Sequence, residues 1–322
     1  MGRRPAIALC LAACSLLTAS SSAAGAAAGP APPTSRELER ATERFLDSRR
    51  ARVPDPAASA TGTGGIGKPG GGGLFPQQRL VALYGAPQMT ATIVGRKSVN
   101  NLRKQARKQA RTYRGSGPEV VPGIDLVAAI ATSDRGRDGK YRTRQPDDVI
   151  ARYAHAADQI GGRLMLDIQP GRSSFKKELR ALREWIEMPD VDVALDPEWN
   201  VGRRGKPGRT TGRLKARELN EVSAYLNRIV RQEGLPDKAL VVHQFRTGSV
   251  RQRDRVQARA GVDVTLNFDG IGGAAAKRAG YRRLTRDDLF AGFSLFYKLD
   301  RGLMKPAAVT RLEPPPNFVL YQ

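Results

Sequence analysis

The sequence predicts an α/β fold, a (β/α)8-type (TIM-like) barrel with parallel strands, on three observations. Apolar segments typical of buried strands alternate with segments of helical periodicity, which favours a parallel sheet covered by helices. About 250 residues follow the N-terminal region, which is a typical size for one such barrel. No glycine-rich dinucleotide turn follows the first strand, so an open Rossmann-type sheet is disfavoured.

The predicted strands are mostly continuous apolar runs, as expected for strands that are buried on both faces. Seven of them lie at 79–85, 123–131, 163–169, 191–195, 239–245, 262–268 and 290–298, and a late run at 317–322 would close the set. The predicted helices between them cover 98–114, 146–161, 173–188 and 215–234. The segment 146–161 begins with Pro-Asp-Asp and ends at a glycine, which are helix start and stop signals.

The N-terminal region predicts export. Residues 1–23 contain two early arginines, an apolar run and then small residues, which is the form of a secretory signal segment. Within it, the run LAAC ending at Cys14 is like a bacterial lipobox, in which Cys14 carries the lipid; ordinary cleavage near Ala23 is the alternative. Residues 24–78 are expected to be an Ala/Pro/Gly-rich linker with one short helix, followed by a barrel domain at 79–322.

Composition narrows the range of partners and chemistry. The formal net charge is +23, from 54 Lys and Arg against 31 Asp and Glu, so the surface attracts polyanions. The basic residues are spread along the chain, which argues against a specific nucleic acid site; anionic cell-envelope polymers and lipid headgroups feel the same field. Both cysteines, Cys10 and Cys14, fall in the signal segment, so the barrel domain has no disulfide, thiol nucleophile or cysteine metal site. We expect no cofactor and no partner protein.

Polar side chains at the ends of the predicted strands mark a candidate site. In a barrel of this kind the active site lies at the carboxyl ends of the strands. Any single acid there could instead cap a helix or pair with an arginine, but several polar strand ends at one mouth favour a ligand site. The candidates are Tyr84, Asp167, Gln169, Asp196, Glu198, Trp199, His243, Gln244, Asn267, Asp269 and Tyr297.

The stretch VALDPEWN suggests acid catalysis. Asp196 and Glu198 are two residues apart, which in extended chain puts both carboxylates on the same side. Carboxylates so close repel, so one pKa should rise; that acid can protonate a leaving group while its ionised neighbour stabilises charge. Trp199 offers either a flat face for a sugar ring or simple core filling.

His243 leaves three roles open: a proton shuttle, a hydrogen-bond donor to substrate, or a metal ligand. A cluster of His243 with the strand-end acids could bind a hard divalent cation, but no compact metal motif is present, so we predict no metal site. No Gly-x-Ser-x-Gly elbow exists, so serine hydrolysis of the α/β-hydrolase type is unsupported.

Four segments carry a resemblance to known proteins: LMLDIQPGRS (164–173), VALDPEWN (193–200), VVHQF (241–245) and LNFDG (266–270). Together with the signal segment and linker, they resemble a family of uncharacterised secreted or lipid-anchored actinobacterial proteins with a TIM-barrel-like domain. The resemblance implies the location and a barrel-like fold over residues 79–322, but no activity.

Asp196-Pro197-Glu198-Trp199 is also similar to the fourth-strand ending of chitinase-type (family 18) glycoside hydrolase barrels. That similarity implies Glu198 as the general acid and Asp196 as its partner. The chitinase-type enzymes carry a further acid two residues before the Asp, where this chain has Ala194.

The leading hypothesis is an exported barrel that hydrolyses a glycan or cell-envelope polymer, with the remaining candidates binding substrate. One alternative is a non-catalytic lipoprotein that binds a saccharide or envelope polymer with the same residues. A second is a metal-dependent phosphoester hydrolase. All three place the protein outside the cell, either secreted or attached to the outer face of the membrane through a lipid on Cys14.

Overall fold

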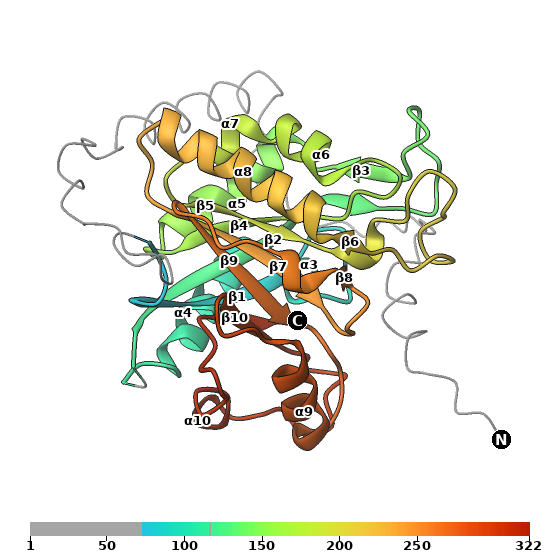
Figure 1. Cartoon of the computed structure of the whole chain (residues 1–322). Coiled ribbons are helices and arrows are strands. Elements are labelled where there is room, and N and C mark those ends of the chain that lie inside the picture. The colour runs from blue at the N-terminus through green and yellow to red at the C-terminus, as the bar shows by residue number, and fades with distance from the viewer. Residues whose placement is uncertain (1–72, 116) are drawn as a thin grey trace, which may run out of the picture.

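Eight parallel strands close into a barrel in the computed structural model, which describes residues 73–115 and 117–322. Around the barrel they run β1 (Gln78–Gly85), β2 (Glu119–Ala131), β4 (Arg163–Ile168), β5 (Val191–Leu195), β7 (Lys238–Gln244), β9 (Val262–Phe268), β10 (Phe290–Leu295) and β11 (Phe318–Tyr321). β11 pairs back onto β1, so the barrel of eight strands has no free edge. Figure 1 shows the molecule from one side, with α8 lying across the barrel strands. The predicted (β/α) barrel is therefore confirmed, including closure by the last apolar run.

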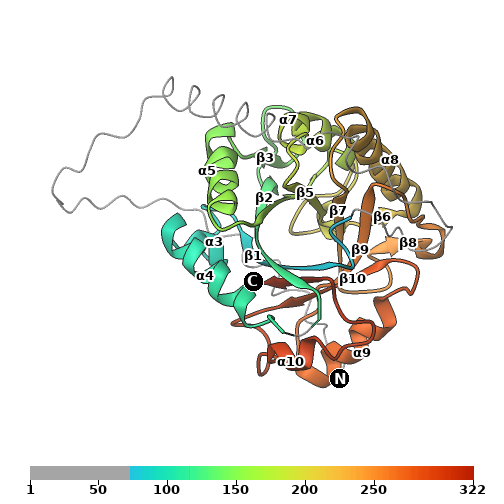
Figure 2. The same cartoon turned by 90° about the vertical axis from the view of Figure 1, so that its left-hand side faces the viewer.

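Helices surround the strands on the outside of the barrel (Figure 2). They are α3 (Ile93–Arg96), α4 (Val99–Arg111), α5 (Asp147–Asp158), α6 (Phe175–Ala181), α7 (Arg183–Ile186), α8 (Ala216–Gln232), α9 (Ala274–Leu284) and α10 (Pro306–Val309). α8 buries Leu219, Val222, Leu226 and Ile229, which recur at the three- and four-residue spacing of one helical face. The barrel is thus apolar where strands meet helices, which explains the continuous hydrophobic runs in the sequence.

The structure differs from the predicted elements in a few places. The helix predicted at 173–188 is interrupted at Leu182 and forms α6 and α7. β10 ends at Leu295, earlier than predicted. The sequence did not indicate α9 and α10, the antiparallel strand β3 (Arg142–Arg144) beside β2, or the small sheet of β6 (Leu214–Lys215) and β8 (Val250–Arg251).

The signal segment, Cys14 and the linker up to residue 72 lie outside the described residues. Leu74 and Phe75, which belong to the segment predicted as linker, are buried. The Phe75 ring lies 5.5 Å from the Phe290 ring, centroid to centroid, so packing against the barrel begins before Arg79. Within 73–115 and 117–322, none of the helices combines the length and the apolar character that crossing a membrane requires.

The interior of the barrel contains many polar side chains. Residues at the same register in parallel strands share a face, and the register pairs Tyr84 with Asp125, and His243 with Asn267. The same alternation directs Asp167 to the interior, because it lies two residues beyond the partner of Asp125. A barrel core is usually filled by bulky branched apolar residues, so this polar layer needs a separate explanation.

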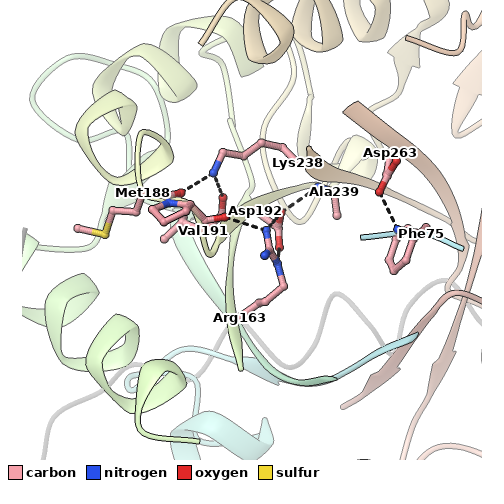
Figure 3. A network of polar contacts seen from close by, with 9 residues as sticks. Phe75, Arg163, Met188, Val191, Asp192, Lys238, Ala239 and Asp263 are labelled. Atoms are coloured by element: carbon pink, nitrogen blue, oxygen red, sulfur yellow. Dashed lines mark hydrogen bonds and ion pairs between the residues drawn. The ribbon is translucent and has the colours of Figure 1, made fainter. Parts of the chain in front are cut away.

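At the amino ends of the strands lies a network of polar contacts around the ion pair of Arg163 and Asp192 (Figure 3). Arg163 donates to both oxygens of Asp192, at 2.5 and 2.9 Å, and the Ala239 N–H donates to the same carboxylate at 2.8 Å. Lys238 donates to the carbonyls of Met188 and Val191. These contacts tie together the first residues of β4, β5 and β7.

Close packing around Asn267, in the polar interior of the barrel, requires a glycine at position 292. A Cβ on Gly292 would lie 2.7 Å from Asn267 Oδ1 and 3.0 Å from Asn267 Cβ. The Asn267 amide is held by His243 and Ser294, so it cannot move aside freely. We expect Gly292→Ala to lower the free energy of unfolding by about 1–3 kcal/mol, as overpacking of a filled core does. Denaturant titration measures this.

Gly248→Ala is the matched control for this substitution, because Gly248 is exposed and a Cβ there meets no atom within 4 Å. We expect its free energy of unfolding to stay within about 0.5 kcal/mol of wild type. Equal stability of the two variants would show that the Asn267 amide is not fixed.

Candidate functional site

A cavity of about 230 Å³ opens at the carboxyl ends of the strands, where barrel enzymes hold their active sites. It is lined by one residue each of β1 and β7, by the loop after β1, and by residues that follow β5, β9, β10 and β11. The lining residues are Tyr84, Met89, Ala91, Thr92, Arg96, Asp196, Glu198, Trp199, His243, Asp269, Phe296, Lys298, Leu299 and Gln322. Six of the predicted site residues therefore share one cavity.

Asp196 is held in place by two hydrogen bonds at the end of β5. Gln169 Nε2 donates to its Oδ2 at 2.9 Å, and the Tyr84 hydroxyl donates to the same oxygen at 3.4 Å. Gln169 is itself fixed, because its Oε1 accepts from the Ala131 N–H at 3.1 Å. Burial raises the pKa of Asp196, while His243 and these two hydrogen bonds act in the opposite direction.

Glu198 lies in a 3-10 turn, Pro197–Trp199, and not in extended chain as the sequence spacing suggested. The Pro197 ring fixes φ and favours such a turn directly after the strand. The side chain still reaches the same cavity as Asp196, and its Oε2 is buried with no hydrogen-bond partner among the described residues. Burial, together with the charges of Asp196 and Asp269, holds the pKa of Glu198 well above its usual value. The expectation of one raised carboxyl is therefore met at Glu198, although Asp196 is shifted in the same direction.

Below the cavity floor lies a second acidic pair, Asp125 and Asp167, both fully buried. His243 Nε2 is 3.7 Å from Asp167 Oδ2, and His243 Nδ1 is 3.0 Å from Asn267 Nδ2. Burial raises the pKa of both carboxyls well above the usual value, and the charge of Asp196 adds to the shift in each.

Asp269 and Trp199 complete the cavity wall. Asp269 Oδ1 accepts a hydrogen bond of 2.8 Å from Gln322 Nε2. Trp199 is only 7% exposed and borders the cavity, and the hydrophobic core cluster of the described residues does not include it. This placement favours the cavity wall over core filling, and a role as a flat face for a sugar ring stays a prediction.

The remaining predicted residues do not line the cavity. Gln169 and Asn267 act from beneath, through Asp196 and His243 respectively. Gln244 follows His243 directly, so alternation turns it outward, and its Nε2 donates to the Leu284 carbonyl at the end of α9. Tyr297 packs toward α4, where its hydroxyl donates to Gln109 Oε1 at 2.8 Å. Direct substrate binding by Gln244 or Tyr297 is not supported by this placement.

Sequence reasoning missed several residues at the site, among them Asp125, Ser294, Arg96, Lys298 and Gln322. A signal for Asp125 existed, because it is a lone acid inside the apolar run GIDLVAAIA and therefore in a buried strand. Arg96 and Lys298 are exposed cations on the cavity lining, and nothing in their local sequence distinguishes them from the other basic residues.

No protein-family model matches this chain, and no curated protein is significantly similar to it. The barrel and the composition of its cavity are therefore the observations from which a function must be argued.

Proposed function

We propose that this protein hydrolyses a glycan or a cell-envelope polymer, with Glu198 as general acid and Asp196 as its partner. The observation that carries the proposal is the state of Glu198: a carboxyl with a raised pKa and an unpartnered buried oxygen, on the wall of a cavity at the active-site end of a barrel. A carboxyl that keeps its proton to a higher pH than usual can donate that proton to a leaving group.

The two acids have different surroundings, which suits two different roles. Glu198 would protonate the glycosidic oxygen as the bond from that oxygen to the anomeric carbon breaks. Asp196 accepts two hydrogen bonds, and these stabilise its ionised form. Ionised Asp196 would stabilise the positive charge that develops on the sugar ring. Water supplies the hydroxyl group of the new reducing end.

The charge around the cavity favours an acidic polymer. Arg96 and Lys298 are exposed on the cavity lining, and the whole chain carries a net charge of +23. Cations at the mouth of a site raise the local concentration of an anionic substrate. An exported protein with this surface would meet such polymers in the cell envelope, and export with a lipid on Cys14 remains part of the proposal.

The first test uses wild-type protein and a panel of neutral and acidic envelope glycans, with release of reducing ends as the measurement. We expect turnover of at least one acidic glycan, and a rate that falls as salt screens the attraction. Saturable binding with no release over long incubation would instead support the non-catalytic envelope-binding alternative. If no glycan of the panel is bound or cleaved, the proposal is contradicted.

A further inference from the structure

The layer beneath the cavity floor contains two buried carboxyl groups that no lysine or arginine among the described residues pairs with. Asp125 and Asp167 are both 0% exposed, and neither oxygen of Asp125 has a hydrogen-bond partner among the described residues. The Asp167 carboxylate is stabilised by the backbone N–H of Ile168, but no side chain among those residues donates a hydrogen bond to it. None of the ion pairs among those residues joins either carboxylate to a lysine or arginine; the nearest basic group is His243. Buried carboxylates without partners are costly, and in proteins they are paired or bound to a metal.

The three side chains converge on one point. One donor atom from each of Asp125, Asp167 and His243 lies within 4.8 Å of the other two. Donors in a tetrahedral zinc site lie about 3.4 Å apart, because each bond is about 2.0–2.1 Å long. The separation of 3.7 Å between His243 Nε2 and Asp167 Oδ2 is close to that geometry. Closing the set around an ion requires each donor to move by less than about 1 Å.

We propose that Asp125, Asp167 and His243 bind one divalent transition-metal ion beneath the cavity floor, with Zn²⁺ the best fit. Two carboxylates and one imidazole give a neutral complex with M²⁺, which removes the charge imbalance in the barrel interior. The imidazole disfavours Ca²⁺ and Mg²⁺, which take oxygen ligands, and suits zinc and its neighbours. Since His243 also lines the cavity, the ion is reached from that side.

The surroundings of His243 support a ligand role. In metal sites the second ring nitrogen is usually hydrogen-bonded, which fixes the ring. His243 Nδ1 has this contact with the Asn267 amide, which Ser294 holds in turn at 2.8 Å. Exchanging the oxygen and nitrogen of this amide, with the side chain otherwise in place, would let Asn267 Oδ1, now buried and without a partner, accept from Nδ1–H and leave Nε2 free for the ion. The proposal does not depend on glycan hydrolysis.

The test is a titration of chelator-treated, dialysed full-length protein with Co²⁺, followed by displacement with Zn²⁺. We expect one Co²⁺ per chain, with the visible absorption of an imidazole-bound ion, and full displacement by one equivalent of Zn²⁺. Asp125→Asn and Asp167→Asn should weaken binding by at least about 100-fold, and Asn267→Ala by about 10–100-fold. Asp287→Asn, which alters an exposed acid, should bind like wild type.

Thermal unfolding distinguishes a metal site from a pair of buried acids that binds no metal. Without metal, Asp125→Asn should unfold at a higher temperature than wild type, because it replaces a buried ionisable carboxyl that has no partner by a neutral amide. With saturating Zn²⁺ the order should reverse. If Zn²⁺ shifts both proteins equally, or wild type takes up no Co²⁺, the site does not exist. The Co²⁺ titration of wild type tests the metal site even if the asparagine variants do not fold. Because it uses no substrate, its result does not depend on the outcome of the glycan assay.

Discussion

Glu198→Gln is expected to lower kcat for glycan hydrolysis by about 10²–10⁴-fold, the range that general acid catalysis contributes. Glutamine keeps the shape of the side chain but has no proton to transfer at any accessible pH. KM should change little, because the substitution leaves the rest of the cavity lining in place. Steady-state kinetics on whichever glycan the wild type cleaves provides the measurement.

The pH profile gives a second readout of the same variant. Since the acid must be protonated, wild-type kcat/KM should fall as the pH rises through the raised pKa of Glu198. The remaining activity of Glu198→Gln should lack this descending limb. Glu221→Gln is the matched control, because Glu221 is an exposed glutamate on α8 and is not among the residues that line the cavity. A Glu198→Gln enzyme with wild-type rate and profile would falsify the assignment of the general acid.

The strands of the barrel could be predicted because each one is buried on both faces. Runs such as VDVAL and VDVTLNF match β5 and β9 to the residue. The helices were harder to predict where the apolar face is short or interrupted. α9 begins AAAKRAG, which has little amphipathic pattern, and the helix predicted at 173–188 breaks where Leu182 leaves helical geometry.

The candidate site was predictable at the strand ends but not inside the barrel. Asp196, Glu198 and His243 were found because barrel chemistry gathers at the carboxyl ends of strands. Successive residues of a strand point to opposite faces, so adjacent polar residues have different roles. His243 points into the barrel and Gln244 points outward, which the alternation predicts once the register is known. Asp125 and Ser294 were missed because they are single polar residues within apolar runs. Only the closed barrel shows that Asp125 lies beside Asp167 and His243, and that Ser294 holds the Asn267 amide.

The opposite end of the barrel gives the largest expected effect on stability, through Arg163. This guanidinium forms two hydrogen bonds to Asp192, which is fully buried (Figure 3). Burial opposes the charge on Arg163, but Asp192 outweighs it and raises the Arg163 pKa. Lys238 donates to the carbonyls of Met188 and Val191 and not to Asp192, and burial lowers its pKa to about 7. Arg163 is therefore the main cationic partner of Asp192.

Arg163→Met should lower the free energy of unfolding by about 3–5 kcal/mol, because it leaves a buried carboxylate without its partner. For a domain of this size each kcal/mol corresponds to about 2–4 °C in Tm. Thermal and urea unfolding, followed by circular dichroism, would measure the loss. Arg183→Met is the matched control: Arg183 also pairs with a carboxylate, Glu187, but on the surface, where such a pair contributes about 0–1 kcal/mol.

The double variant Arg163→Met/Asp192→Asn separates the loss of the ion pair from the loss of packing. Asparagine at 192 removes the stranded charge and keeps an oxygen that can accept from the Ala239 N–H. If the cost of Arg163→Met is mainly an uncompensated charge, the double variant should recover most of the lost stability, as neutral replacements of buried ion pairs do. If the double variant is as unstable as Arg163→Met, the arginine stabilises this end of the barrel by filling space and by its bond to the Pro189 carbonyl, and not by its charge.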